Sequence, residues 1–294
     1  MLFGYNLALH NRPISVRALM LCLVVLFSSY ESYRRWLIKN ARMSSGGVKF
    51  SKYDSVEQVG VAMCEQVVHS ALECLQMKKQ FSLGVSGGSM TKLLSNLPKL
   101  FADNEVLKAG LDNGQVKIFL CDERKVSYES EDSTYGAYKK VWTGGSVDLV
   151  SALVPINPDL SLAECASDYE AKMAASTGPS LSLDLALLGI GPDGHTCSLF
   201  PAHPLLKESK VGIVPISDSP KPPPERVTLT LPAVRAAAKK IVFATGSGKQ
   251  PIVKRVLVDG ETSDVIPVSL VPSGKQDESV LWLIDGESSK DLNL

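Results

Sequence analysis

The sequence predicts an α/β protein whose mainly parallel β-sheet is covered by helices on both faces. From Lys49 onward, short apolar runs alternate with segments of helical periodicity, and the runs are FSLGV, VKIFL, LDLALLGI, VGIVPI, KIVFAT and VLWLI. Strands that are separated by helices need crossover connections, which make neighbouring strands parallel. With 294 residues, 45% of them hydrophobic, the chain is long enough to bury the core of such a fold.

The first residues differ in composition, so we divide the chain into an N-terminal extension, residues 1–47, and a single domain, residues 48–294. The extension contains the apolar run ALMLCLVVLF, with arginines on either side. A helix needs about 20 apolar residues to span a bilayer, so this shorter run predicts no stable membrane span. We expect a cytoplasmic protein with a poorly ordered extension, and organelle import directed by residues 1–42 is the alternative.

The segment DSVEQVGVAMCEQVVHSALECLQMKK is predicted to be an amphipathic helix. Asp54 and Glu57 have the spacing of a capping box, and the apolar residues behind them recur at helical intervals. A second helical segment, MTKLLSNLPKLF, follows the Ser-Gly-Gly-Ser run at residues 86–89. A further helix is expected to begin at His195, after the apolar run and turn LLGIGPDG.

Polar residues follow four of the predicted strands, at the points where those strands end. The four groups are Ser86-Gly87-Gly88-Ser89, Asp122-Glu123-Arg124, Gly191-Pro192-Asp193-Gly194-His195 and Gly246-Ser247-Gly248-Lys249. The carboxyl ends of parallel strands meet at one edge of a sheet, where open α/β sheets bind their ligands. The sequence therefore predicts one site that is built from all four groups.

Two of these groups are suited to a phosphate. Glycines such as Gly87 and Gly88 let backbone N–H groups approach an anion, and Lys249 adds a positive charge. GSGKQ does not have the spacing of a nucleotide-binding loop, because Phe243 replaces the first glycine and Gln250 follows the lysine. Two alternatives remain open: Lys249 is a solvated lysine, or Ser86 within GVSGG is the nucleophile of a serine hydrolase.

The other two groups are suited to acid–base chemistry. At a helix N-terminus, His195 would be kept neutral by the helix dipole, and beside Asp193 it would be a general base for activating water. Arg124 would orient a carbonyl or carboxylate group, with Asp122 holding the arginine or the histidine in place. The alternatives are a histidine that caps its own turn and a solvated charge triplet.

The charge balance and the cysteine pattern exclude several classes of function. Equal numbers of basic and acidic residues, 31 of each, leave no basic field for nucleic acid. The six cysteines are scattered without a C-x-x-C pair and the histidines are not clustered, so we expect reduced thiols and no metal site. No cofactor is expected, and the protein is expected to be a monomer or a weak dimer.

In several blocks the sequence resembles the 6-phosphogluconolactonases. The blocks, in the order of that family, are LGVSGGSM, FLCDER, DSTYG, LDLALLGIGPDGHTCSLFPAHPLL, SDSPKPPPERVTLTLPAV, FATGSGKQ and VLWLIDG. The resemblance covers residues 49–285 and leaves out the extension. It implies the Rossmann-like fold that this family shares with glucosamine-6-phosphate deaminases and ribose-5-phosphate isomerases.

The resemblance also implies a reaction: hydrolysis of 6-phospho-D-glucono-1,5-lactone to 6-phosphogluconate, in the oxidative pentose phosphate pathway, without metal or nucleotide. His195 matches the family's general base, and Arg124 matches the arginine near the lactone. The matches to its phosphate cradle are Gly87, Gly88, Ser89, Arg226 and Lys249. The sequence departs from the family pattern at Lys125 and Ser127 after DER, and at Thr134, where asparagine is frequent; the last departure affects a substrate contact.

Three other functions remain open at this point. A serine esterase would use Ser86 with His195, and a related sugar-phosphate deaminase or isomerase would use the same fold. A sugar-phosphate sensor would keep the phosphate cradle without the chemistry, although the presence of both His195 and Arg124 argues against it.

Overall fold

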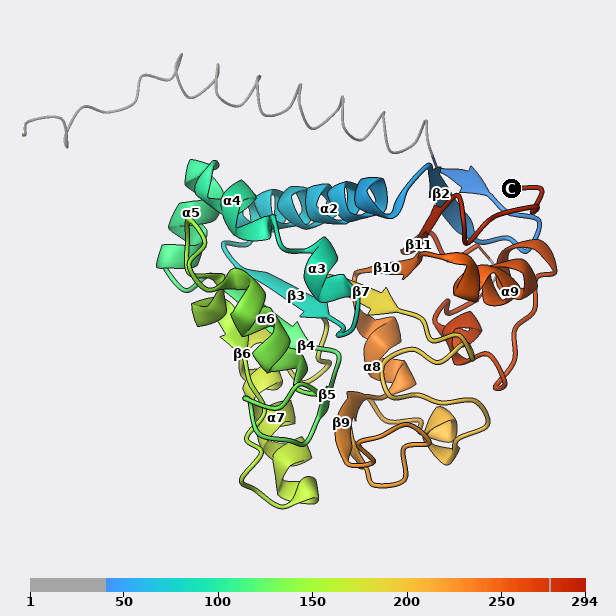
Figure 1. Ribbon diagram of the computed structural model, residues 1–294. Helices are drawn as coiled ribbons and strands as arrows, with labels where there is room; N and C mark the ends of the chain where they lie inside the picture. The colour runs from blue at the N-terminus through green and yellow to red at the C-terminus, as the bar shows by residue number, and fades with distance from the viewer. Residues whose placement is uncertain (1–40, 275) are drawn as a thin grey trace, which may run out of the picture. The chain divides into compact units, whose positions relative to one another are not determined.

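The computed structural model describes residues 41–274 and 276–294, which form two β-sheets and the helices around them (Figure 1). The strands in these ranges are β1 Arg42–Met43, β2 Lys49–Tyr53, β3 Phe81–Val85, β4 Val116–Leu120, β5 Asp122–Arg124, β6 Leu153–Val154, β7 Leu185–Gly189, β8 Ile213–Ile216, β9 Arg226–Leu229, β10 Lys239–Ala244 and β11 Val280–Asp285. In the larger sheet their order is β1-β2-β11-β10-β7-β3-β4-β6. Every neighbouring pair in this sheet is parallel except β1 with β2, which confirms the predicted fold class.

Both faces of the larger sheet are covered. Successive side chains of a strand point to opposite faces, and all five residues of β3 are buried. A strand that is buried on both faces has a continuous apolar sequence, and for this reason FSLGV and LALLG could be predicted as strands. The largest side chains in the core include Trp142, Trp282 and Tyr138.

A smaller sheet contains β5, β9 and β8 in that order, and all of its pairs are antiparallel. Two expectations are wrong here. The run VGIVPI forms β8 of this sheet and not a strand of the parallel sheet. The triplet Asp122-Glu123-Arg124, expected only as polar residues after a strand end, is itself strand β5. The triplet becomes a strand because it pairs with β9, a segment about a hundred residues further along the chain.

The helices of the described residues are α2 Val56–Met77, α3 Met90–Leu93, α4 Leu97–Ala102, α5 Glu105–Asp112, α6 Thr134–Trp142, α7 Leu162–Thr177, α8 Leu231–Ala236 and α9 Gln250–Val253. Shorter helical turns are η1 Leu149–Ala152, η2 Pro204–Lys207, η3 Ser247–Lys249, η4 Lys254–Val258 and η5 Pro267–Leu270. Helix α2 contacts β3 and β11 of the parallel sheet, and α7 contacts β8 and β9 of the smaller one.

The N-terminus of α2 is capped one residue later than the capping-box pattern predicted. Ser55 is the N-cap, and its hydroxyl accepts a hydrogen bond from the backbone N–H of Gln58. The side chain of Gln58 accepts from the backbone N–H of Asp54. Ser55 and Gln58 have the same three-residue spacing as Asp54 and Glu57, so the spacing alone did not distinguish the two pairs.

Most of the predicted extension, residues 1–40, lies outside the described residues. Within the rest of it, β1 pairs with β2, and the Ser45 hydroxyl donates a hydrogen bond to the carbonyl oxygen of Val258, at 2.7 Å. Across residues 41–274 and 276–294, no helix combines the length and the apolar character that crossing a membrane requires.

Candidate active site

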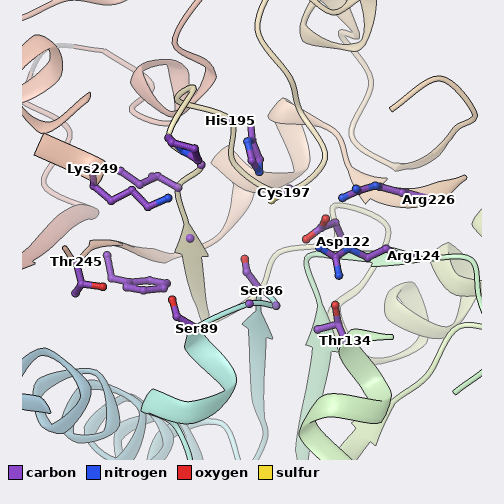
Figure 2. A pocket seen from close by; sticks show the side chains of 17 residues that line it. Ser86, Ser89, Asp122, Arg124, Thr134, His195, Cys197, Arg226, Thr245 and Lys249 are labelled. Atoms are coloured by element: carbon purple, nitrogen blue, oxygen red, sulfur yellow. The ribbon is translucent and has the colours of Figure 1, made fainter. Parts of the chain in front are cut away.

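The four groups of polar residues that follow predicted strands lie together. They follow β10, β7, β3 and β4, which are four consecutive strands of the parallel sheet. The chain passes from β3 to β4 on one side of β3 and returns to β7 on its other side, so the order reverses at the β3/β7 boundary, where such sheets bind ligands. A pocket of about 250 Å³ opens there, and residues from all four groups line it (Figure 2).

His195 is held in this pocket by a tight turn. The backbone N–H of Gly191 donates to the His195 carbonyl oxygen at 2.8 Å, and Gly194 takes a positive φ of 83° to close the turn. The Asp193 carboxylate lies 2.5 Å from the imidazole through Oδ1 and Nδ1. With Nδ1–H donating to Asp193, Nε2 is left as the acceptor, and it makes no hydrogen bond within the described part of the chain.

No helix begins at His195, so that expectation is wrong. Residues 196–199 form a turn that is closed by a bridge between Thr196 and Leu199. Burial, and not a helix dipole, lowers the pKa of His195 below its usual value; Asp193 opposes this shift and Lys221 adds to it. A lowered pKa favours the neutral imidazole near pH 7, and the cause is burial and not the predicted helix dipole.

Asp193 contacts a cation as well as the neutral histidine. The Lys221 ammonium group lies 2.9 Å from Asp193 Oδ2. Burial raises the pKa of the Asp193 carboxyl, but the hydrogen bonds from Lys221 and His195 outweigh burial and lower this pKa to about 2. Asp193 is therefore ionised throughout the physiological range.

On one side the pocket is lined by Lys249, Ser89 and Thr245 (Figure 2). Lys249 ends η3 just before α9, and burial together with the charge of Lys221 lowers its pKa. Gly87 and Gly88 both line this pocket, and Gly88 has a φ of 69°, which favours glycine. The helix after them, α3, is only four residues long, because the predicted segment breaks into α3 and α4.

On the opposite side lie Arg124, Arg226 and Asp122 (Figure 2). Arg124 and Arg226 are cross-strand partners on β5 and β9. Two like charges directly opposite each other are unfavourable in a sheet, so this pair makes the wall attractive to an anion. The Asp122 carboxylate partly offsets the positive charge of the two arginines. Its position is fixed by the Ser198 hydroxyl, which donates a hydrogen bond to Oδ2 at 2.7 Å.

Most N–H groups of the Arg226 guanidinium donate hydrogen bonds to other residues of the protein. Its Nε donates to the Pro223 carbonyl oxygen, its Nη2 to those of Lys221 and Pro222, and its Nη1 to the Ser198 hydroxyl. Arg226 thus braces the loop between β8 and β9 in addition to lining the pocket. It lies across the pocket from Lys249, with which the sequence grouped it.

Arg124 is oriented by its neighbour Glu123. The buried Glu123 carboxylate accepts hydrogen bonds from the backbone N–H groups of Arg124, Thr134 and Tyr135. It therefore joins β5 to the N-terminus of α6, and Arg124 Nη1 donates to the carbonyl oxygen of Asp132 in the same connection. Burial raises the pKa of Glu123, while these backbone hydrogen bonds oppose the shift.

Ser86 is not arranged as a nucleophile. Its hydroxyl donates to the carbonyl oxygen of Leu187 at 3.1 Å and not to His195. Its own carbonyl oxygen accepts from the Tyr138 hydroxyl at 2.8 Å, so Ser86 joins β3, β7 and α6. A serine nucleophile needs a hydrogen bond to its base, and this arrangement disfavours the esterase alternative.

Sequence reasoning gave no role to two residues that contact His195. Phe200 packs against the imidazole with 4.9 Å between ring centroids, and Lys221 Nζ lies 3.0 Å from Nδ1. Both lie inside blocks that carry the family resemblance, GPDGHTCSLFP and PKPPPERVTLT, and this was the available signal. Neither follows a parallel strand, so the pattern of polar residues at strand ends did not indicate them.

The cysteines and the possible metal ligands form no further centre among the described residues. Cys64, Cys74, Cys121, Cys165 and Cys197 carry free thiols. No group of three or more His, Cys, Asp or Glu side chains in residues 41–274 and 276–294 is placed to hold a metal ion.

The fold and the site together define an α/β protein whose pocket, at the carboxyl edge of the sheet, is lined by three cationic side chains and a histidine held by a carboxylate. Comparison with known proteins identifies the group within this class. The chain belongs to the family of glucosamine-6-phosphate isomerases and 6-phosphogluconolactonase, whose model matches residues 54–282.

Individual relatives agree with this assignment. The chain is similar to human 6-phosphogluconolactonase, with 41% identity over 251 residues, 83% of this chain and 93% of the human protein. It has the fold of 6-phosphogluconolactonase from Trypanosoma cruzi, with a TM-score of 0.68 and 23% identity over 86% of this chain and 99% of that one. A monomeric glucosamine-6-phosphate deaminase also shares the fold, with a TM-score of 0.62 and 19% identity over 81% of this chain and 98% of that one.

Proposed function

We propose that the protein hydrolyses 6-phospho-D-glucono-1,5-lactone to 6-phospho-D-gluconate, the second step of the oxidative pentose phosphate pathway, with His195 as the base that activates water. The observation that carries this proposal is the position of His195. Its Nδ1 is held by Asp193, and its ring lines a pocket with Lys249 on one side and Arg124 on the other.

In the proposed mechanism, Nε2 of His195 takes a proton from water as the oxygen attacks the lactone carbonyl carbon. The ring C–O bond of the tetrahedral intermediate then breaks, and the imidazolium returns the proton to the departing ring oxygen. Asp193 keeps the imidazole in the tautomer that this step needs and stabilises the charged form. Arg124 lies within the same pocket and supplies positive charge for the developing oxyanion.

The phosphate is placed on the opposite side from the arginines, between Lys249 and the Gly87-Gly88-Ser89 loop. There it is held away from the reacting carbon, so its binding energy positions the lactone ring. In this proposal Arg226, which the resemblance assigned to the phosphate cradle, instead braces the loop after β8 and adds positive charge on the other side of the pocket.

A direct test is to follow freshly generated lactone by the release of acid, above the spontaneous rate. Glucosamine 6-phosphate is tested in parallel, with ammonia as the readout. Lactone hydrolysis without ammonia release supports the proposal. Ammonia release without lactone hydrolysis would instead indicate the deaminase alternative, and binding of 6-phosphogluconate with neither reaction would indicate a sensor.

Three further expectations are part of this proposal. The protein acts as a monomer or a weak dimer, in the cytoplasm, with residues 1–47 as an extension of a single domain. Sedimentation of the purified chain tests the first. A fluorescent fusion to the whole chain and to residues 43–294 tests the second, since organelle import that depends on residues 1–42 would contradict it.

A further inference from the structure

We propose that Lys221 is a positioning residue for His195: its ammonium group neutralises Asp193, holds the imidazole in one orientation and keeps it unprotonated. The proposal rests on the function proposed above, in which His195 is the base. Lys221 lies outside the strand ends that form the pocket, and it reaches the histidine from the loop between β8 and β9.

The contacts of Lys221 carry the inference. Its Nζ lies 2.9 Å from Asp193 Oδ2 and 3.0 Å from His195 Nδ1. The other carboxylate oxygen, Oδ1, lies 2.5 Å from the same Nδ1. The three side chains therefore form a closed triangle in which Asp193 is shared between a permanent cation and the imidazole.

The geometry of the triangle decides which group holds the proton. Nδ1 can carry one hydrogen, and its shorter contact is with Asp193 Oδ1. Nδ1–H therefore donates to Oδ1, while the Lys221 ammonium group pairs with Oδ2. A second proton on Nε2 would place an imidazolium charge against the ammonium group at 3.0 Å. Lys221 opposes that state, whereas Asp193 alone would favour it.

The backbone of Lys221 is held by hydrogen bonds, which fix the position from which its side chain reaches His195. Its carbonyl oxygen accepts hydrogen bonds from Arg226 Nη2 and from the Ser219 hydroxyl, both at 2.8 Å. Its N–H donates to the same hydroxyl at 3.2 Å. Arg226, itself buried, thereby connects the arginine side of the pocket to the lysine that faces the base.

Other charged groups around His195 act on its protonation as well. Asp122, on β5, favours the protonated form, and Asp193 does so more strongly. Lys249, from η3, is close enough to Asp193 and Lys221 for their charges to change its pKa. Arg226 contacts the Phe200 ring that packs on the imidazole. Of these cations, Lys221 is the one in direct contact with the imidazole ring, so we expect its removal to affect His195 more than the removal of Lys249 or Arg226.

The experiment is an NMR titration of the histidine side chains in the full chain. The His195→Ala variant assigns the His195 signal among four histidines. Replacing Lys221 with methionine is expected to raise the titration midpoint of His195 by about one pH unit or more. Lys221→Arg is expected to leave it near the wild-type value, and Lys210→Met, at an exposed lysine, is the matched control for loss of charge.

The same variants are then assayed for lactone hydrolysis against pH. The acidic limb of kcat/KM is expected to move upward in Lys221→Met by the same amount as the NMR midpoint, and to recover in Lys221→Arg. An unchanged midpoint, an equal shift in Lys210→Met, or a loss of rate that is uniform across pH would overturn the proposal. If Lys221→Met does not fold, Lys221→Gln provides the same comparison.

The two proposals fail in different ways. If the wild-type protein does not hydrolyse the lactone, or His195→Ala keeps full activity, the proposed function fails. The titration midpoint of His195 still reports whether Lys221 sets its protonation, because NMR observes the imidazole without any turnover.

Discussion

Gly191 leaves the space that the imidazole of His195 occupies. A Cβ atom at position 191 would lie 2.0 Å from Nδ1 of His195 and 2.3 Å from Oδ1 of Asp193, so no side chain fits there without moving both groups. The glycine in LLGIGPDGH is thus required by the close packing of these two side chains.

Replacing Gly191 with alanine is therefore expected to displace the base. We expect kcat/KM for lactone hydrolysis to fall by about 100-fold, since a shift of about 1 Å in a catalytic group has effects of this size. Gly274→Ala is the matched control, because a Cβ atom at that exposed position meets no atom within 4 Å. Equal activity of the two variants would show that His195 need not keep this position.

Lys249 is expected to bind the phosphate of the substrate and of the product. Removing one hydrogen bond to a charged group costs about 1.5–3 kcal/mol, so Lys249→Ala should weaken 6-phosphogluconate binding by about tenfold or more. Calorimetric titration measures this loss. Lys254→Ala, which removes an exposed lysine paired with Asp259, should bind as the wild type does. Unchanged affinity in Lys249→Ala would move the phosphate to the arginine side.

Ser86 is expected to have a structural role and no covalent one. Because its hydroxyl donates to the Leu187 carbonyl oxygen, Ser86→Ala should keep lactone hydrolysis within about tenfold of wild type and lower stability by about 1 kcal/mol. A fluorophosphonate probe should not label the wild-type protein. Labelling that disappears in Ser86→Ala would support the serine esterase instead.

The buried carboxylate of Glu123 is expected to stabilise the fold near the site. Glu123→Gln turns one of two accepting oxygens into a donor that faces backbone N–H groups. We expect the free energy of unfolding, measured by urea denaturation, to fall by about 2 kcal/mol. The exposed Glu129, in the same connection, is the control position for a Gln substitution. Similar stability of the two variants would show that Glu123 does not anchor α6.

The parallel strands and their loops could be predicted from the sequence because both signals are local. FSLGV, VKIFL and LALLG are buried on both faces, so each is a continuous apolar run. Several of the polar residues that line the pocket come shortly after such runs. The rule that ligands bind at the carboxyl ends of parallel strands then placed Gly87, His195 and Lys249 in one pocket, as found.

The smaller sheet depends on contacts between distant segments and could not be predicted in this way. Asp122-Glu123-Arg124 is too short and too polar to indicate a strand, and it becomes one only by pairing with β9. The same pairing places Arg226 beside Arg124 and lets it hold the Lys221 carbonyl oxygen. The contact of Lys221 with His195 follows from this sheet, so no local pattern in the sequence indicated it.

The central claim is that His195 acts as an unprotonated base. The most direct test is kcat/KM for lactone hydrolysis from about pH 5 to about pH 8, for the wild type and for His195→Ala, with spontaneous hydrolysis subtracted. Burial lowers the pKa of His195, so the wild-type rate should be constant at neutral pH. The rate should fall only when the pH is below the ordinary histidine pKa of about 6.5. In His195→Ala, kcat/KM should fall by about 100-fold to 10,000-fold, and its decrease at acidic pH should disappear. A variant that keeps both the rate and the limb would contradict the account.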